Sequence, residues 1–328
     1  MTWDQLDGLA LYRYRIDLSL ERDLAIASQQ RAAIWRGAFG ASLRSLVCHD
    51  RNLECDGCPL AEPCPYVRVF APRIPDGRPV IARLHDPPRP FVLTDPRPDA
   101  DSLPRTTSLA LGMVVAGTAI EQLLYLLVTI RKQGELGLGR HRVKFAVEQV
   151  RSLDADGLAV HEVWRQGSDL VRAHRTPLRA RDLMRPGDDR ARRVRVRFIT
   201  PTDVRSHASA AASGPSAPSF GALLRRARDR VGALATFFGD GALDFDPRQM
   251  ATLADEVTTL SSDVTAERVQ RRSARTGQRH PIGGVVGSAV YEGDAIARLM
   301  PWLRVVELVG VGKHATFGNG RVAVELLA

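Results

Sequence analysis

Apolar residues at alternate positions open the regular part of the chain. Residues 11–18 alternate between apolar side chains such as Tyr12 and Ile16 and charged ones such as Arg13, which predicts a half-buried strand. Residues 29–47 then repeat apolar positions at the spacing of one helix face. The chain is therefore expected to begin with a strand followed by a helix.

The pattern of apolar positions also predicts the remaining elements of the first half. A short strand is expected at 90–93, a longer strand at 106–115 and an apolar helix at 119–131. A glycine-rich, basic stretch at 134–142 then leads into a strand at 143–148. The order of the first half is strand, helix, strand, strand, helix, strand.

The second half repeats this order. Residues 193–198 alternate as the first strand does, and a helix is expected at 220–238. Two antiparallel strands follow at 264–274 and 282–291. An apolar helix at 296–309, a glycine-rich basic loop and an alternating segment close the chain. Two halves that end in the same way indicate a diverged internal duplication.

This element order is that of the split βαβ, or ferredoxin-like, arrangement. We therefore expect an α+β protein of two tandem ferredoxin-like (RRM-like) domains, an N-terminal one over residues 1–190 and a C-terminal one over 191–328. The charged segment 181–193, which contains proline and glycine, is the expected boundary.

Composition and charge narrow the class of partner. The 328 residues are 44% hydrophobic and 25% charged, which is typical of a globular protein. The apolar run at 109–130 is broken by glycine and polar residues, and the N-terminus lacks a signal-peptide pattern, so we expect no membrane association and a cytoplasmic location. The formal net charge of +9 favours an anionic partner, with nucleic acid the first candidate.

The C-terminal glycine-rich loop at 310–321 carries the clearest candidate chemistry. Glycine is used where the backbone takes positive φ or where another group approaches closely. Lys313, His314 and Arg321 place cationic or titratable groups among these glycines. The pattern predicts contact with phosphate through Gly310, Gly312, Lys313, Gly318, Gly320 and Arg321.

All four cysteines lie between residues 48 and 64, in an insertion after the first helix. Their clustering favours a bound metal over disulfides, with Cys48, Cys55, Cys58 and Cys64 as ligands. Structural zinc is the first interpretation and an iron–sulfur cluster the second. The alternative is four reduced cysteines in a loop. His49 is a possible substitute ligand.

Several motifs together resemble a known family. The pattern Gly-x-Gly-Lys-x-x-Thr-Phe-Gly-x-Gly-Arg at 310–321 is similar to the signature loop of the RAMP (repeat-associated mysterious protein) superfamily. Arg36-Gly-Ala-Phe-Gly40, Cys55-x2-Cys58 with Cys64-Pro-Tyr66, Arg89-Pro-Phe-Val-Leu93 and Gly283-Gly-Val-Val-Gly287 agree with it. Within the superfamily the match is to the CRISPR precursor-RNA processing endoribonucleases.

The resemblance implies a substrate and a reaction. The chain would bind the repeat hairpin of precursor CRISPR RNA and cut it without a catalytic metal, yielding mature guide RNAs. In the family the ribose 2′-OH attacks the adjacent phosphate and leaves 2′,3′-cyclic phosphate and 5′-OH ends. Such a step needs in-line alignment, a base and positive charge on the phosphorane.

The catalytic histidine is less clear. Many family members carry it in or just before the first helix, but residues 19–47 contain no histidine here. The candidates are His314 first, His49 second and His280 third. Arg36 and Arg275 are further candidates for RNA contact. Each histidine could instead contact RNA without catalysis.

Two other functions remain open at this point. The missing first-helix histidine favours a non-catalytic RNA-binding RAMP subunit of a CRISPR effector complex, whereas similarity over most of the chain favours the nuclease. A weaker alternative is a DNA-binding zinc protein unrelated to CRISPR.

Overall fold

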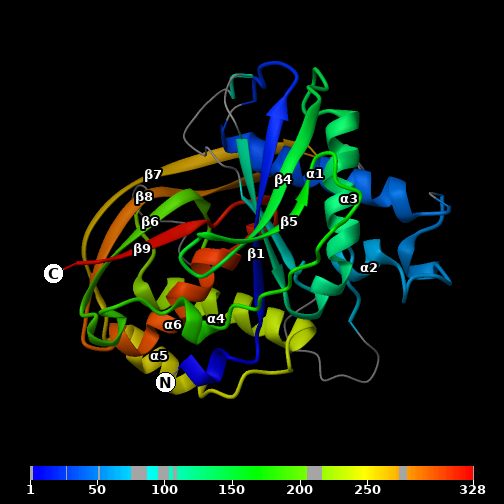
Figure 1. Ribbon diagram of the computed structural model, residues 1–328. Coiled ribbons are helices and arrows are strands. Elements are labelled where there is room, and N and C mark those ends of the chain that lie inside the picture. Colours follow the sequence, from blue (N-terminus) through cyan, green and yellow to red (C-terminus); the bar gives the residue numbers. More distant parts are fainter. Residues whose placement is uncertain are drawn as a thin grey trace. The chain divides into compact units, whose positions relative to one another are not determined.

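The chain forms two units, each with one antiparallel sheet (Figure 1). The N-terminal unit comprises Leu11–Pro177 with Phe237–Gly239, and the C-terminal unit comprises Met1–Ala10, Leu178–Thr236 and Asp240–Ala328. The computed structural model describes residues 3–26, 28–50, 52–74, 87–94, 103–105, 109–204, 216–272 and 279–327.

The sheet of the N-terminal unit has the order β2-β3-β1-β4-β5, and its neighbouring strands are all antiparallel. Tyr14 of the central strand lies opposite Met113 on one side and Ser152 on the other. The first four strands have the order expected for a ferredoxin-like sheet. The strands are β1 (Leu11–Leu20), β2 (Phe91–Thr94), β3 (Leu109–Ala116), β4 (Phe145–Leu153) and β5 (Ala159–Arg165).

Two long helices pack against each other in this unit, α1 (Ser28–Val47) and α3 (Leu123–Leu136). Aromatic side chains hold α1 to the sheet, because Trp35 lies 5.2 Å from Phe145 between ring centroids and Phe39 lies 5.2 Å from Phe91. The shorter elements are η2 (Cys55–Gly57), α2 (Pro65–Val69) and η3 (Gly117–Gln122).

The sheet of the C-terminal unit repeats this topology with the order β7-β8-β6-β9. Its central strand, β6, pairs with β8 through Val196 and Ala289 and with β9 through Val196 and Val324. The same strand order in both units confirms the predicted tandem ferredoxin-like fold. The strands are β6 (Arg193–Thr202), β7 (Thr258–Arg272), β8 (Arg279–Glu292) and β9 (Val322–Leu326).

The helices of the C-terminal unit are α4 (Phe220–Phe238), α5 (Pro247–Asp255) and α6 (Ile296–Val309). Phe220, Leu224, Ala227 and Val231 of α4 are buried at helical spacing, so this helix presents one apolar face to the core. Short 3-10 turns complete the unit: η1 (Trp3–Leu6), η4 (Ala180–Leu183), η5 (Asp188–Arg190) and η7 (Ala315–Phe317).

A buried ion pair joins α6 to the elements beside it. Arg304 donates to both carboxylate oxygens of Asp188 at 2.9 and 2.7 Å, and the two residues are 2% and 0% exposed. It also donates to Glu307 and to the carbonyl of Val324 in β9, each at 2.8 Å. Burial lowers the pKa of Arg304, but the hydrogen bonds that Arg304 donates to the carboxylates of Asp188 and Glu307 outweigh this effect, so the pKa is raised above its ordinary value.

The compact units do not divide at the predicted boundary between residues 190 and 191. The division falls between Pro177 and Leu178, and residues 1–10 belong to the C-terminal unit. The segment expected as a linker is ordered because Asp188 anchors it to Arg304. Leu6 and Leu9 are 1% and 3% exposed, which accounts for the place of the N-terminus in that unit.

Strand β5 and helix α5 were not predicted from the sequence. Val160 of β5 is 46% exposed, so the alternation that marks a half-buried strand is weak there. The helix expected at 119–131 runs longer, to Leu136, after a 3-10 turn. Among the helices that the structure describes, none has the length and apolar character to cross a membrane.

The buried ion pair predicts that substitutions at two adjacent aspartates change the free energy of unfolding by very different amounts. Asp188→Asn leaves the Arg304 guanidinium buried with one fewer carboxylate and should lower the free energy of unfolding by about 3 kcal/mol. Asp189→Asn is the matched control, because that side chain is 79% exposed, and should change it by less than about 0.5 kcal/mol. Urea unfolding followed by fluorescence and circular dichroism measures both, and equal stabilities would contradict the prediction.

Candidate nucleic-acid interface

The C-terminal glycine-rich loop joins α6 to β9 (Figure 1). Gly310 ends the helix with φ 76° and ψ 167°, and its N–H donates to Val306 at 2.8 Å. Gly312, Gly318 and Gly320 also have positive φ, at 85°, 83° and 71°. The predicted use of glycine for left-handed backbone is therefore confirmed at all four positions.

The space beside two of these glycines is filled by the chain itself. A Cβ on Gly312 would lie 2.5 Å from the carbonyl oxygen of Asp203, and one on Gly320 would lie 1.9 Å from that of Val311. The group that approaches closely is therefore backbone of this chain at both positions, from the segment after β6 at Gly312 and from the loop itself at Gly320. The glycines shape the loop. Among the side chains between them, Val311, Ala315 and Asn319 are buried, whereas Lys313 is exposed.

Thr200 at the end of β6 and Asp203 just after it hold the loop in place, and no sequence pattern predicts either residue. The Thr200 hydroxyl donates to the carbonyl of Gly318 at 2.9 Å and accepts the N–H of Arg321 at 2.9 Å. The carbonyl of Asp203 accepts the N–H of Lys313 at 2.9 Å. These partners are over a hundred residues from the loop in sequence, so no local pattern could have revealed them.

Lys313 and His314 lie next to each other at the turn of the loop. Lys313 is exposed and forms no ion pair with a carboxylate in the part of the chain that the structure describes. His314 is half-buried, its ring centroid lies 5.9 Å from that of Phe317, and its φ is 65°. A residue other than glycine at positive φ is held there by its surroundings, and such strain is common at functional sites. Arg321 is half-buried at the end of the loop.

The other predicted contact residues lie in different settings. His49 is exposed and lines a hollow with the four cysteines. His280 lies opposite Arg271 in the register of β7 and β8, and only its backbone is described. Arg275 lies outside the described residues.

Arg36 has a packing partner. It is 9% exposed, and its guanidinium carbon lies 4.2 Å from the centre of the Phe70 ring. A Cβ on Gly40 would lie 2.1 Å from the same ring, so Gly40 makes room for it. The Arg36–Gly40 motif therefore seats Phe70 on α1, and the predicted RNA contact of Arg36 stays a prediction.

Solved structures share this fold over nearly the whole chain. Thermus thermophilus Cas6 is 13% identical with a TM-score of 0.51, over 97% of this chain and 99% of that one. A Cas6 product complex is 16% identical with a TM-score of 0.52, over 96% and 99%. A chain of a partial Cas6-RT-Cas1–Cas2 complex is 14% identical with a TM-score of 0.56, over 98% of this chain and 47% of that one.

Two family models match the sequence. Residues 9–176 match AF_1859_N, described as an N-terminal domain, and residues 196–322 match the family described as CRISPR-associated endoribonuclease Cas6. The C-terminal part of the chain therefore matches the Cas6 family, and the fold over nearly the whole chain is that of the Cas6 structures. The activity of the chain is that of an endoribonuclease in CRISPR RNA processing. No curated protein sequence matches the chain.

The four cysteines lie close together in the structure, and their role as metal ligands stays a prediction. The four thiols are half-buried and line one hollow of about 240 Å³. Burial raises the pKa of the Cys55 thiol, which favours its neutral form, while Arg44 acts in the opposite direction. Among the described residues, no three histidine, cysteine or carboxylate side chains converge closely enough to hold a metal ion. The structure does not support the predicted zinc or iron–sulfur site.

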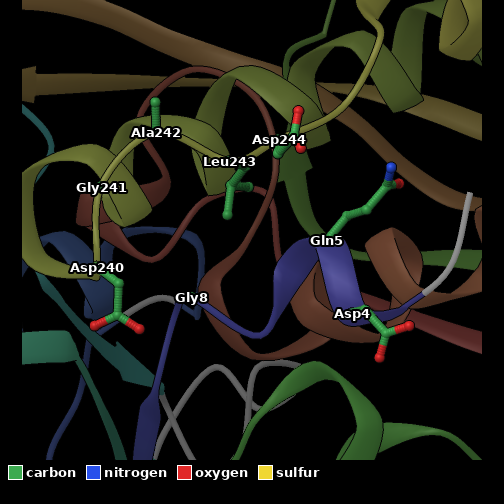
Figure 2. A pocket seen from close by; sticks show the side chains of 8 residues that line it. All are labelled: Asp4, Gln5, Gly8, Asp240, Gly241, Ala242, Leu243 and Asp244. Carbon is green, nitrogen blue, oxygen red and sulfur yellow. The ribbon is translucent and has the colours of Figure 1, made fainter.

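A second hollow, in the C-terminal unit, has the wrong charge for RNA. This hollow has a volume of about 370 Å³, and Asp4, Asp240 and Asp244 are among the residues that line it. Figure 2 shows these three side chains. Carboxylates repel phosphate, so the anionic substrate of a Cas6 endoribonuclease is expected to avoid this surface. The basic terminal loop remains the better candidate for contact with RNA.

The packing of the terminal loop gives a testable contrast between two glycines. Gly320→Ala places a methyl group against the Val311 carbonyl at positive φ and should destabilise the protein by about 1–3 kcal/mol. Gly232→Ala in α4 meets no atom within 4 Å and should be neutral or stabilising by up to about 1 kcal/mol. Thermal unfolding compares the two, and a wild-type midpoint for Gly320→Ala would refute the account of the loop.

Metal analysis checks the cysteine prediction directly. If the four cysteines bind structural zinc, protein purified without chelator should carry about one zinc per chain, and Cys58→Ser should lose it together with thermal stability. As a control, wild-type protein and Cys58→Ser are both stripped of metal with a chelator. Their thermal unfolding midpoints should then be equal. Protein free of stoichiometric zinc and iron would reject both metal interpretations.

Proposed function

We propose that this chain cleaves precursor CRISPR RNA by attack of a ribose 2′-OH, without a catalytic metal. The observation that carries the proposal is the terminal loop, where an exposed lysine and a histidine at positive φ stand side by side. Cleavage of this kind needs a proton acceptor and a positive charge at the phosphorane, and these two residue types supply them.

The proposed step balances as follows. The 2′-oxygen gives up its proton to a base and bonds to phosphorus, the bond from phosphorus to the 5′-oxygen breaks, and the 5′-oxygen takes up a proton. The products are a 2′,3′-cyclic phosphate and a 5′-OH. We assign the proton transfer to His314 and the stabilisation of the phosphorane to Lys313. Arg321 is assigned to a neighbouring phosphate.

The substrate and partners belong to the same proposal. We infer that the bound RNA is the repeat hairpin of the precursor transcript, cut to release mature guide RNAs. One similar structure is a partial Cas6-RT-Cas1–Cas2 complex, which supports association of this chain with other CRISPR proteins. A nuclease that acts on transcripts acts where transcripts are made, so a cytoplasmic location is part of the proposal.

His314→Ala should slow single-turnover cleavage of the repeat RNA by roughly 10²-fold or more at saturating protein, with EDTA present throughout. His161→Ala is the matched control and should cleave at the wild-type rate, because His161 stacks on His174 in the N-terminal unit and is not part of the proposed site. Product ends are identified by mass spectrometry, which distinguishes a cyclic phosphate from a linear one.

Each part of the proposal can fail separately. An unchanged rate in His314→Ala would move the proton transfer to His49 or His280. Loss of wild-type cleavage in EDTA would overturn metal independence. RNA that is bound but never cut would favour the non-catalytic RNA-binding role.

A further inference from the structure

The N-terminal unit contains a second copy of the loop geometry. Its helix α3 ends at Gly137 with φ 78° and ψ 162°, compared with 76° and 167° at Gly310 after α6. The N–H of Gly137 donates to Gln133, four residues back, at 2.9 Å, as the N–H of Gly310 donates to Val306 at 2.8 Å. The two helices therefore end by the same backbone turn.

The residues after the turn also correspond. Gly137-Leu-Gly-Arg-His141 follows α3, and Gly310-Val-Gly-Lys-His314 follows α6. Leu138 and Val311 are both buried, at 1% and 0%, so each anchors its loop beneath the surface. In the part of the chain that the structure describes, Arg142 and His314 are the two residues other than glycine with positive φ. Each lies in one of the two loops, Arg142 one position further from its turn than His314.

The copy in the N-terminal unit carries more exposed charge than the terminal loop. Arg140, His141, Arg142 and Lys144 are all exposed. No described carboxylate forms an ion pair with Arg140, Arg142 or Lys144. Arg22 donates to the carbonyl of His141 at 2.6 Å, which brings a further guanidinium to the same place. The nearby Glu135 is paired with Lys132.

We infer that this segment, residues 137–144, is a second binding site for the RNA ribose–phosphate backbone. Cations so close together repel one another, and phosphates would relieve that repulsion while accepting hydrogen bonds from the guanidinium groups. The exposed side chains stand on a rigid turn fixed by two backbone hydrogen bonds of 2.9 Å between Leu138 and Val143. The inference rests on the proposed RNA substrate and adds a contact outside the terminal loop.

The test removes three charges at the loop and three elsewhere in the same unit. The loop variant is Arg140→Gln/Arg142→Gln/Lys144→Gln, and the control is Arg105→Gln/Arg172→Gln/Arg175→Gln, which are exposed arginines with the same change in net charge. Binding of fluorescent 2′-O-methyl repeat RNA, which cannot react by 2′-OH attack, is measured at several salt concentrations. Circular dichroism verifies that both variants fold.

The loop variant should bind about tenfold or more weakly, and its log–log salt slope should fall by about 2 relative to wild type. The control should keep most of the wild-type slope. Equal effects in the two variants, with wild-type binding intact, would overturn the second site and leave the proposed function standing. Wild-type protein that neither binds nor cuts the repeat RNA would overturn both.

Discussion

The fold depends on a backbone conformation that is open almost only to glycine. With φ near 77° and ψ near 165°, Gly310 and Gly137 occupy a region that a Cβ makes strongly unfavourable. Each glycine ends its helix, α3 or α6, and turns the chain back toward the sheet. The strand that follows, β4 or β9, then pairs with the central strand, β1 or β6. Both sheets, and both basic loops, follow from this one turn.

In the C-terminal unit, a buried ion pair adds to the conformational constraint that the glycines impose. Arg304 connects α6 with β9 and with η5, so the two elements that flank the terminal loop are tied together beneath it. Thr200 and Asp203 then hold the loop's backbone from β6 and the residues after it. The loop is thus fixed at both ends and along its length, which allows Lys313 and His314 to be presented without moving the backbone.

Periodicity and glycine spacing predicted the tandem fold and the loop, because alternation, helical spacing and positive φ are local properties of the sequence. The unit boundary depends on the burial of Leu6 and Leu9 and on the partner of Asp188, which are contacts between distant residues. The hydrogen bonds of Thr200 also join residues that are distant in sequence. The contact of Arg36 with Phe70 does so too, and it buries an arginine, a residue type that is usually exposed. Strand β5 was missed because its exposed residues carry little pattern.

The backbone packing against Gly312 and Gly320 divides the terminal loop into two kinds of position. The glycines cannot accept a side chain without breaking the turn, whereas Lys313 projects from a frame that does not depend on its side chain. A family built on this loop can therefore exchange the outward residues and keep the scaffold. For protein engineering, positions 313 and 314, with 140 and 141 in the other unit, become matched sites at which charge or acid–base chemistry can be transplanted between the two halves of one chain.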